Sequence, residues 1–155
     1  MKTFLIVISV ILVLILVSFF VLGVLSKSGD APGLANQKLS KCSAKPNCVN
    51  SEFKIDNKHF IAPIQIPLNS PADLLETLKK SVEEMGGTIQ LINENYLAAT
   101  FTSRVFKFVD DFEIRIDRTQ NLLHIRAGSR VGYSDGGVNK HRVESLRKTL
   151  TAIQQ

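Results

Sequence analysis

The first 25 residues differ from the rest of the chain in their hydrophobic pattern. An uncharged run, FLIVISVILVLILVSFFVLGVL, extends from Phe4 to Leu25, and serine and glycine are its only weakly polar residues. At about 1.5 Å per residue, a helix of this length spans the roughly 30 Å hydrocarbon core of a bilayer. We therefore expect a transmembrane anchor at residues 4–25.

A cleaved signal peptide is the competing interpretation of this segment. The apolar region of a signal peptide usually has about 7–15 residues and precedes a small-x-small cleavage site. The run here is longer, and no Ala-x-Ala-like motif follows it. The pattern favours an uncleaved single-pass anchor. Residues 26–39, which are rich in Gly, Ser, Pro and polar side chains, then follow as a linker.

Two later segments have the periodicity of amphipathic helices. The first starts near Ser70, a residue that can cap a helix, and ends at the Gly-Gly pair at 86–87. The second follows the Gly-Gly pair at 136–137. Its apolar positions are Val143, Leu146, Leu150 and Ile153. The helical projection places Asn139 in the first turn as a cap and directs Arg142 toward the sheet.

Between these helices the pattern changes to the two-residue period of β-strands. Strands are expected at 88–93, 96–102, 112–117 and 122–127, and a proline-containing edge segment is expected at 59–68. A short link joins the last two strands as an antiparallel hairpin. We set its register by pairing Ile116 with Leu123. This register is charge-complementary, because Glu113 then lies opposite Arg126, and both side chains face outward.

The order of these elements predicts an α+β fold. An N-terminal transmembrane helix is followed by a two-layer domain, in which an antiparallel sheet of four to five strands carries two helices on one face. Residues 40–155 are enough for one hydrophobic core and too few for two. We therefore expect a single domain over 40–155.

Composition and charge change this picture only slightly. The chain is 45% hydrophobic, but much of that content lies in the anchor. There are 19 Lys and Arg against 14 Asp and Glu, a net charge of +5, and the charges are interspersed. Nucleic-acid binding usually requires a concentrated basic stripe. The balance therefore suits a surface near an anionic membrane, and we expect no nucleic-acid partner.

Cys42 and Cys48 are the only cysteines in the chain, and they lie close together in the segment KCSAKPNCVNSE. Two thiols without a nearby histidine cannot complete a zinc site. They are either reduced and structural or joined as a disulfide. The short spacing favours the disulfide and therefore an oxidising, extracytoplasmic compartment. In a bacterium this would be an inner-membrane protein with a periplasmic domain.

Polar residues concentrate around the last hairpin and the start of the last helix. The candidate patch comprises Arg104, Asp110, Asp111, Glu113, Arg126, Ser129, Arg130, Tyr133, Asp135, Asn139 and Arg142. An arginine directed at an apolar surface needs a carboxylate partner, because an unpaired buried charge is costly. One interpretation is a structural Arg–carboxylate network that holds the last helix to the sheet. The other is a shallow anion-binding site at the helix start.

Enzymatic interpretations are weaker. Asp110 and Asp111 point to opposite faces if both lie in a strand, so they cannot act as an acid/base pair. A triad of Ser129, His124 and Asp135 lacks the turn that exposes a nucleophilic serine. The histidines are scattered, so we expect neither a metal nor a cofactor.

Three blocks of the sequence carry a resemblance to a known family. They are GLANQKLSKCSAKPNCVNSE, YLAATFTSRVFKFVDDFEI and RAGSRVGYSDGGVNKHRVESLR. Together the blocks resemble domain-of-unknown-function family 1499, over roughly residues 33–150. The resemblance implies a bacterial or plastid protein, often with a membrane or lumenal targeting segment. It implies no established activity.

These patterns predict a membrane-anchored extracytoplasmic domain with a non-enzymatic binding role. Its expected partners are the membrane and an unknown protein, lipid or anionic ligand. The alternative is a hydrolase-like enzyme that acts on an anionic envelope substrate, with Asp110, Asp111 or Asp135 as acid/base.

Overall fold

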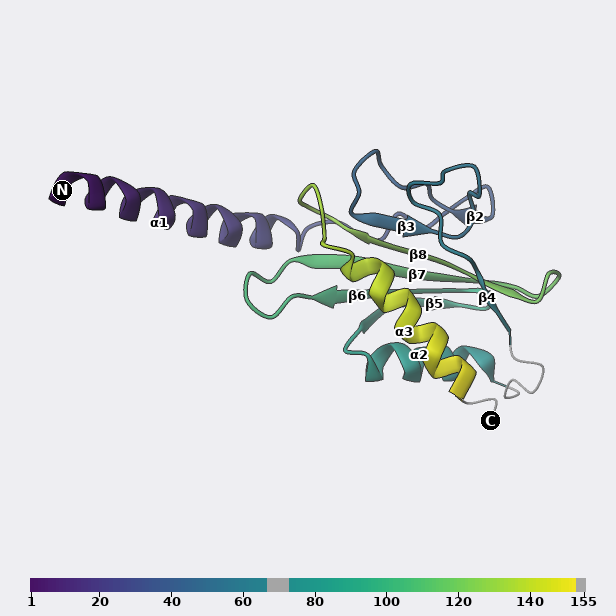
Figure 1. The fold of residues 1–155 in the computed structure, drawn as a ribbon. Coiled ribbons are helices and arrows are strands. Elements are labelled where there is room, and N and C mark those ends of the chain that lie inside the picture. The colour runs from purple at the N-terminus through teal and green to yellow at the C-terminus, as the bar shows by residue number, and fades with distance from the viewer. Residues whose placement is uncertain (67–72, 153–155) are drawn as a thin grey trace.

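The computed structural model of the chain describes residues 1–66 and 73–152. A long N-terminal helix, α1 (Lys2–Leu25), projects from one end of a mixed domain (Figure 1). The domain holds a six-stranded sheet and two helices, α2 (Leu74–Glu84) and α3 (Val138–Ala152). The predicted α+β class is confirmed, with six strands instead of four to five.

The sheet is antiparallel throughout. Its strands are β3 (Cys48–Asn50), β4 (Ile64–Gln65), β5 (Thr88–Asn93), β6 (Tyr96–Thr102), β7 (Val109–Asp117) and β8 (Leu122–Ser129). The order is β3-β8-β7-β6-β5, and β4 pairs with the other end of β8. The β7–β8 register pairs Ile116 with Leu123 and Glu113 with Arg126, as predicted for this hairpin.

One face of the sheet packs against α2 and α3 and forms the main core. Alternate residues of β7 and β8, among them Phe112, Ile114 and Ile125, are fully buried under the helices. Figure 1 shows both helices on the same side of the strands. Asp73 caps α2 by accepting a hydrogen bond from the Glu76 backbone N–H at 3.0 Å. The expected cap at Ser70 and the expected core residue Ile153 lie outside the described residues.

The opposite face is also covered, and this corrects the expectation that its charged residues face outward. Residues 26–39 do not extend away from the domain as a free linker. They contain a two-stranded hairpin of β1 (Leu34–Ala35) and β2 (Lys38–Leu39). Leu39 packs with Tyr96 and Ala98 in a second, small core on this face. As a result, Glu113 is completely buried, and Arg126 is only 9% exposed.

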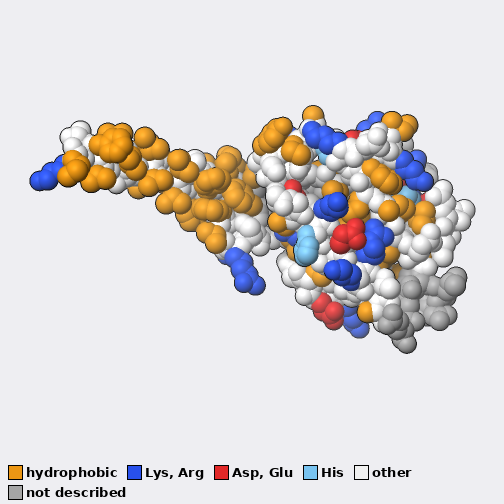
Figure 2. Space-filling model, viewed as in Figure 1, with side chains coloured by type: hydrophobic (Ala, Val, Ile, Leu, Met, Phe, Trp, Pro, Cys, Tyr) orange, Lys and Arg blue, Asp and Glu red, His pale blue; other side chains and the backbone are white. Residues whose placement is uncertain are grey.

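Helix α1 is long and apolar enough to cross a membrane. Figure 2 shows hydrophobic side chains over its visible surface as far as the domain. The disulfide predicted between Cys42 and Cys48 is present. It closes a loop that ends at Cys48, the first residue of β3. The chain continues beside β8, because Cys48–Asn50 pair with that strand and the Ser51 N–H donates to the Ile125 carbonyl at 3.0 Å.

Candidate functional site

The residues of the expected polar patch do not form one surface. Because β7 begins at Val109, both aspartates of its Asp-Asp pair lie in the strand and project to opposite faces. The helix face holds Asp110, Ser129, Asn139 and Arg142, and the other face holds Asp111, Glu113, Arg126 and Arg130. Arg104 and Tyr133 are exposed and join neither group.

On the helix face, Arg142 binds Asp110, as its projection toward the sheet predicts. Its Nη1 donates to Asp110 Oδ2 at 2.6 Å and to Asn139 Oδ1 at 3.0 Å. The guanidinium group also lies 4.7 Å from the centroid of the Phe101 ring. Both charged side chains are largely buried, with 16% of Arg142 and 10% of Asp110 exposed. The pair therefore joins the start of α3 to β7.

Asn139 is not the cap of α3. Asp135 has that role, because its carboxylate accepts hydrogen bonds from the backbone N–H groups of Gly137 (3.0 Å) and Asn139 (2.8 Å). Gly136 and Gly137 adopt the positive φ angles of 63° and 84° that bring the chain into the helix. The Asn139 side chain is buried and donates to the carbonyl of Asn47 and to Ser129 Oγ, both at 3.1 Å.

On the opposite face, Glu113 is a buried carboxylate with three donors. Arg126 Nη1 donates to Oε2 at 2.8 Å, and the Tyr96 hydroxyl (2.7 Å) and the Gly33 backbone N–H (2.8 Å) both donate to Oε1. Burial, together with the negative charge of Glu113, raises the pKa of Tyr96, so its hydroxyl stays protonated and remains a donor. This cluster fastens the N-terminal segment to the sheet.

Arg130 forms the third pair, a forked contact with Asp111. Its Nη2 lies 2.7 Å from Asp111 Oδ1, and its Nε lies 3.0 Å and 3.1 Å from the two carboxylate oxygens. Its Nη1 donates to the Lys27 carbonyl at 3.4 Å, just beyond the end of α1. Arg130 therefore connects the end of α1 to β7.

All four carboxylates of the expected patch thus have structural partners. Three are paired with arginines, and the fourth, Asp135, caps α3. A general acid or base must reach a substrate to exchange its proton, and these contacts already occupy all four carboxylates. The geometry therefore favours the structural interpretation of the network and gives the acid/base alternative no free group among these four.

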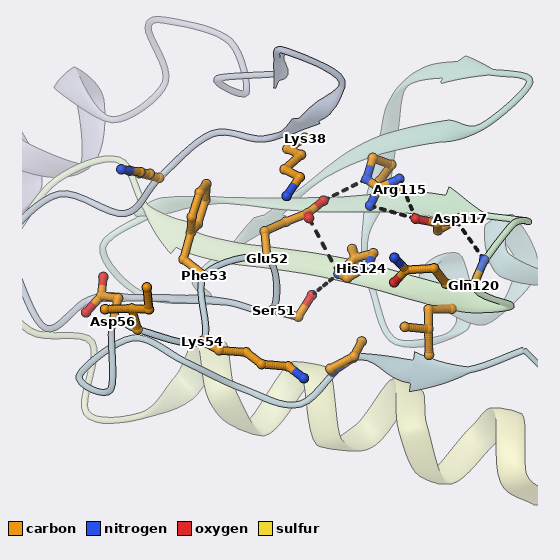
Figure 3. Close-up of a pocket in the computed structure, with 14 residues that line it drawn as sticks. Lys38, Ser51, Glu52, Phe53, Lys54, Asp56, Arg115, Asp117, Gln120 and His124 are labelled. Carbon is orange, nitrogen blue, oxygen red and sulfur yellow. Dashed lines mark hydrogen bonds and ion pairs between the residues drawn. The ribbon is translucent and has the colours of Figure 1, made fainter.

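A separate cleft of about 680 Å³ lies on the covered face, near the far end of the sheet from α1. It was not predicted from the sequence. Figure 3 shows Lys38 and Lys54 approaching it from opposite sides of a central group formed by Ser51, Glu52 and His124. The apolar part of its lining comprises Phe53, Ile55, Pro63 and Leu122.

The central group has the residue types of a catalytic triad but a different geometry. Ser51 Oγ lies 3.2 Å from His124 Nδ1, and Glu52 Oε2 lies 3.7 Å from the same nitrogen. In a triad, the acid and the serine contact opposite ring nitrogens. Ser51 is also buried, and its Oγ accepts the Ile125 backbone N–H at 2.8 Å. The group is therefore a structural anchor for the loop.

Burial also determines the charge of this group. It lowers the pKa of His124, so the imidazole is neutral at neutral pH, and its Nδ1 can accept the hydroxyl proton of Ser51. Glu52 is occupied by Arg115, whose Nε donates to Oε1 at 2.6 Å. Asp117 contacts the same guanidinium at 3.3 Å. Both carboxylates of the floor therefore contact the single guanidinium of Arg115.

The lysines at the rim are different. Lys38, Lys41 and Lys54 form no ion pair with any residue in the ranges 1–66 and 73–152. Lys41 Nζ lies 5.2 Å from the centroid of the Phe53 ring, which places a cation directly above the apolar wall. The cleft therefore combines free positive charge with an apolar surface.

A family model matches residues 38–150, from β2 to near the end of α3. The chain belongs to the family described as protein of unknown function, DUF1499. The match includes the three Arg–carboxylate pairs and the cleft, whereas α1 and Gly33 lie outside it. No curated protein matches the chain.

No group of three or more His, Cys, Asp or Glu side chains in the described part of the chain is arranged to hold a metal ion. That the protein works without a metal or cofactor stays a prediction.

Proposed function

We propose that this DUF1499 protein is a single-pass membrane protein whose domain binds an anionic ligand without changing it chemically. The domain lies on the extracytoplasmic side, which in a bacterium is the periplasmic side of the inner membrane. The ligand occupies the cleft of Figure 3. The observation that carries the proposal is the set of three lysines around the cleft that have no acidic partner among the described residues.

The chemistry of the lining defines the class of ligand. An anionic group can accept hydrogen bonds from Lys38 and Lys54, and an apolar part can lie against Phe53 and Leu122. The two carboxylates of the floor contact Arg115 and form no ion pair with these lysines, so the lysine ammonium groups are available to an anion. A small phosphate monoester, or a free carboxylate, with an aromatic or alkyl portion fits this combination.

Phenyl phosphate is a suitable probe, because it joins a phosphate to an aromatic ring. The full-length protein in zwitterionic detergent micelles would be titrated with it, and binding would be followed by amide chemical shifts. We expect the shifts to concentrate on residues 38–41, 51–56 and 115–124. A charge-assisted hydrogen bond contributes about 1.5 kcal/mol or more, so Lys38→Gln together with Lys54→Gln should weaken binding by roughly a hundredfold.

The matched control is the Lys140→Gln, Lys148→Gln protein, which removes the same charge from two exposed positions of α3. It should bind like the unaltered protein. Equal weakening in both double variants would show a nonspecific charge effect and refute the cleft. Release of phenol and phosphate from the probe would instead support the hydrolase alternative.

A further inference from the structure

We propose that the end of the domain next to α1 rests on the lipid bilayer, with the turn between β6 and β7 (Ser103–Phe108) inserted at the boundary between the headgroups and the hydrocarbon core. The partner is the surface of a bilayer that contains anionic phospholipids. This inference rests on the anchor in the proposed function and is independent of the ligand cleft.

The turn is short and internally held. The Ser103 backbone N–H donates to the Phe108 carbonyl at 2.8 Å, and the Phe108 N–H donates to Ser103 Oγ at 2.9 Å. Four residues therefore project between these two in a fixed conformation, with Lys107 at a positive φ of 61°. Figure 1 shows the turn extending from the sheet toward α1.

The projecting aromatic side chains pack against the last turns of α1. The Phe106 ring lies 5.1 Å from that of Phe19 and 5.2 Å from that of Phe20, measured between centroids. A Cβ atom at Gly23 would overlap the Phe106 carbonyl oxygen, so glycine is required for this close approach. The Val109 backbone N–H also donates to Ser26 Oγ at 3.0 Å.

These contacts fix the depth of the turn. A roughly 30 Å hydrocarbon core takes up about 20 helical residues, so a span that starts at Phe4 ends near Gly23. Phe19 and Phe20 then lie within about 6 Å of the edge of that core, at 1.5 Å per residue. Because Phe106 contacts both of them, its turn must reach the same level of the bilayer.

The outward side chains of this end have the chemistry of a membrane interface. Val105 is 65% exposed, and the flanking Arg104 and Lys107 are also exposed. Tyr133, 71% exposed, and Phe19 line a common hollow of about 380 Å³ between the domain and α1. Apolar and tyrosine side chains prefer the interface, and basic ones are attracted to anionic headgroups. Figure 2 shows basic side chains at both ends of the apolar surface of α1.

The chain contains no tryptophan, so one introduced tryptophan reports on a single position. Val105→Trp places it at the tip of the turn, and Ile55→Trp is the matched control at a position that is 98% exposed and lines the distant cleft. Both full-length proteins would be reconstituted into phosphatidylglycerol–phosphatidylcholine vesicles whose acyl chains are brominated near the headgroups. An unchanged circular dichroism spectrum would confirm that each variant is folded.

We expect the emission of the Val105→Trp protein to shift to shorter wavelength and to lose about half its intensity or more to the brominated lipid, as insertion by about 5–10 Å implies. Adding Arg104→Gln and Lys107→Gln should reduce this loss. The Ile55→Trp protein should show neither effect. Equal quenching of the two tryptophans in a protein that retains residues 1–25 would overturn the inference alone. If mass spectrometry shows that the native protein lacks those residues, the anchor fails and the inference fails with it.

Discussion

Replacing Arg142 with alanine should destabilise the domain. The substitution leaves the Asp110 carboxylate, which is only 10% exposed, without its cationic partner at 2.6 Å. It also removes the cation above Phe101 and the hydrogen bond to Asn139. Removing one partner of a fully buried pair costs about 3–5 kcal/mol. Since this pair retains some solvent contact, we expect the free energy of unfolding to fall by about 2–4 kcal/mol.

Thermal unfolding of the full-length protein in detergent, followed by circular dichroism, measures this loss. A decrease of that size corresponds to a fall in Tm of roughly 10 °C for a domain of this length. Arg104→Ala is the control, because Arg104 is exposed and should contribute less than about 0.5 kcal/mol. Asp110→Asn combined with Arg142→Ala should recover part of the loss, since no unpaired charge remains. An unchanged Tm for Arg142→Ala would refute the claim that these pairs stabilise the fold.

Two further predictions concern the compartment and the response to pH. Cys42 and Cys48 should resist alkylation in intact cells until a reductant is added, because they are joined as a disulfide; ready labelling would place the domain in the cytoplasm. Burial holds the pKa of His124 below its ordinary value of 6.5, so the unfolded chain binds the proton more tightly. The contribution of neutral His124 to the free energy of unfolding should therefore be fully present above about pH 6.5, and it should be lost as the pH falls through the lowered pKa. His124→Asn should flatten this dependence of Tm on pH, and an equally steep decline in that variant would exclude His124 as its cause.

The two helices of the domain and the strands β5 to β8 followed from the sequence, because their signals are local, whereas β1, β2 and β3 were not predicted. Alternation of apolar and charged residues predicted β7 and β8, and pairing Ile116 with Leu123 across the short link gave the register that sets Glu113 opposite Arg126. The alternation could not show that a second segment of the chain covers the polar face of the sheet. The polar face of an antiparallel sheet is usually exposed to water. Here the hairpin of residues 34–39 covers that face, and the polar residues are buried as ion pairs.

The site was harder to predict, for the same reason. Arg142 was correctly directed at the sheet, because a helical projection fixes its direction. The cleft, in contrast, is assembled from segments far apart in the chain. Lys38, Glu52 and His124 come from β2, the residues after β3, and β8. The only local signal of the cleft is the polar pair Ser51 and Glu52, shortly after Cys48. That pair indicates a site only when the pairing of β3 with β8, which brings His124 beside it, is known.

The contact between α1 and the domain has a practical consequence for preparing the protein. Biochemists commonly remove an anchor helix to obtain a water-soluble fragment. A fragment that begins at residue 27 would leave the Val109 N–H without its acceptor, Ser26 Oγ. It would also expose the Phe106 ring, which packs against Phe19 of α1. One that begins at residue 40 would also lose the Gly33 N–H that binds Glu113. Such fragments should aggregate through the uncovered phenylalanines, and replacing Phe106 with a polar residue should be part of their design.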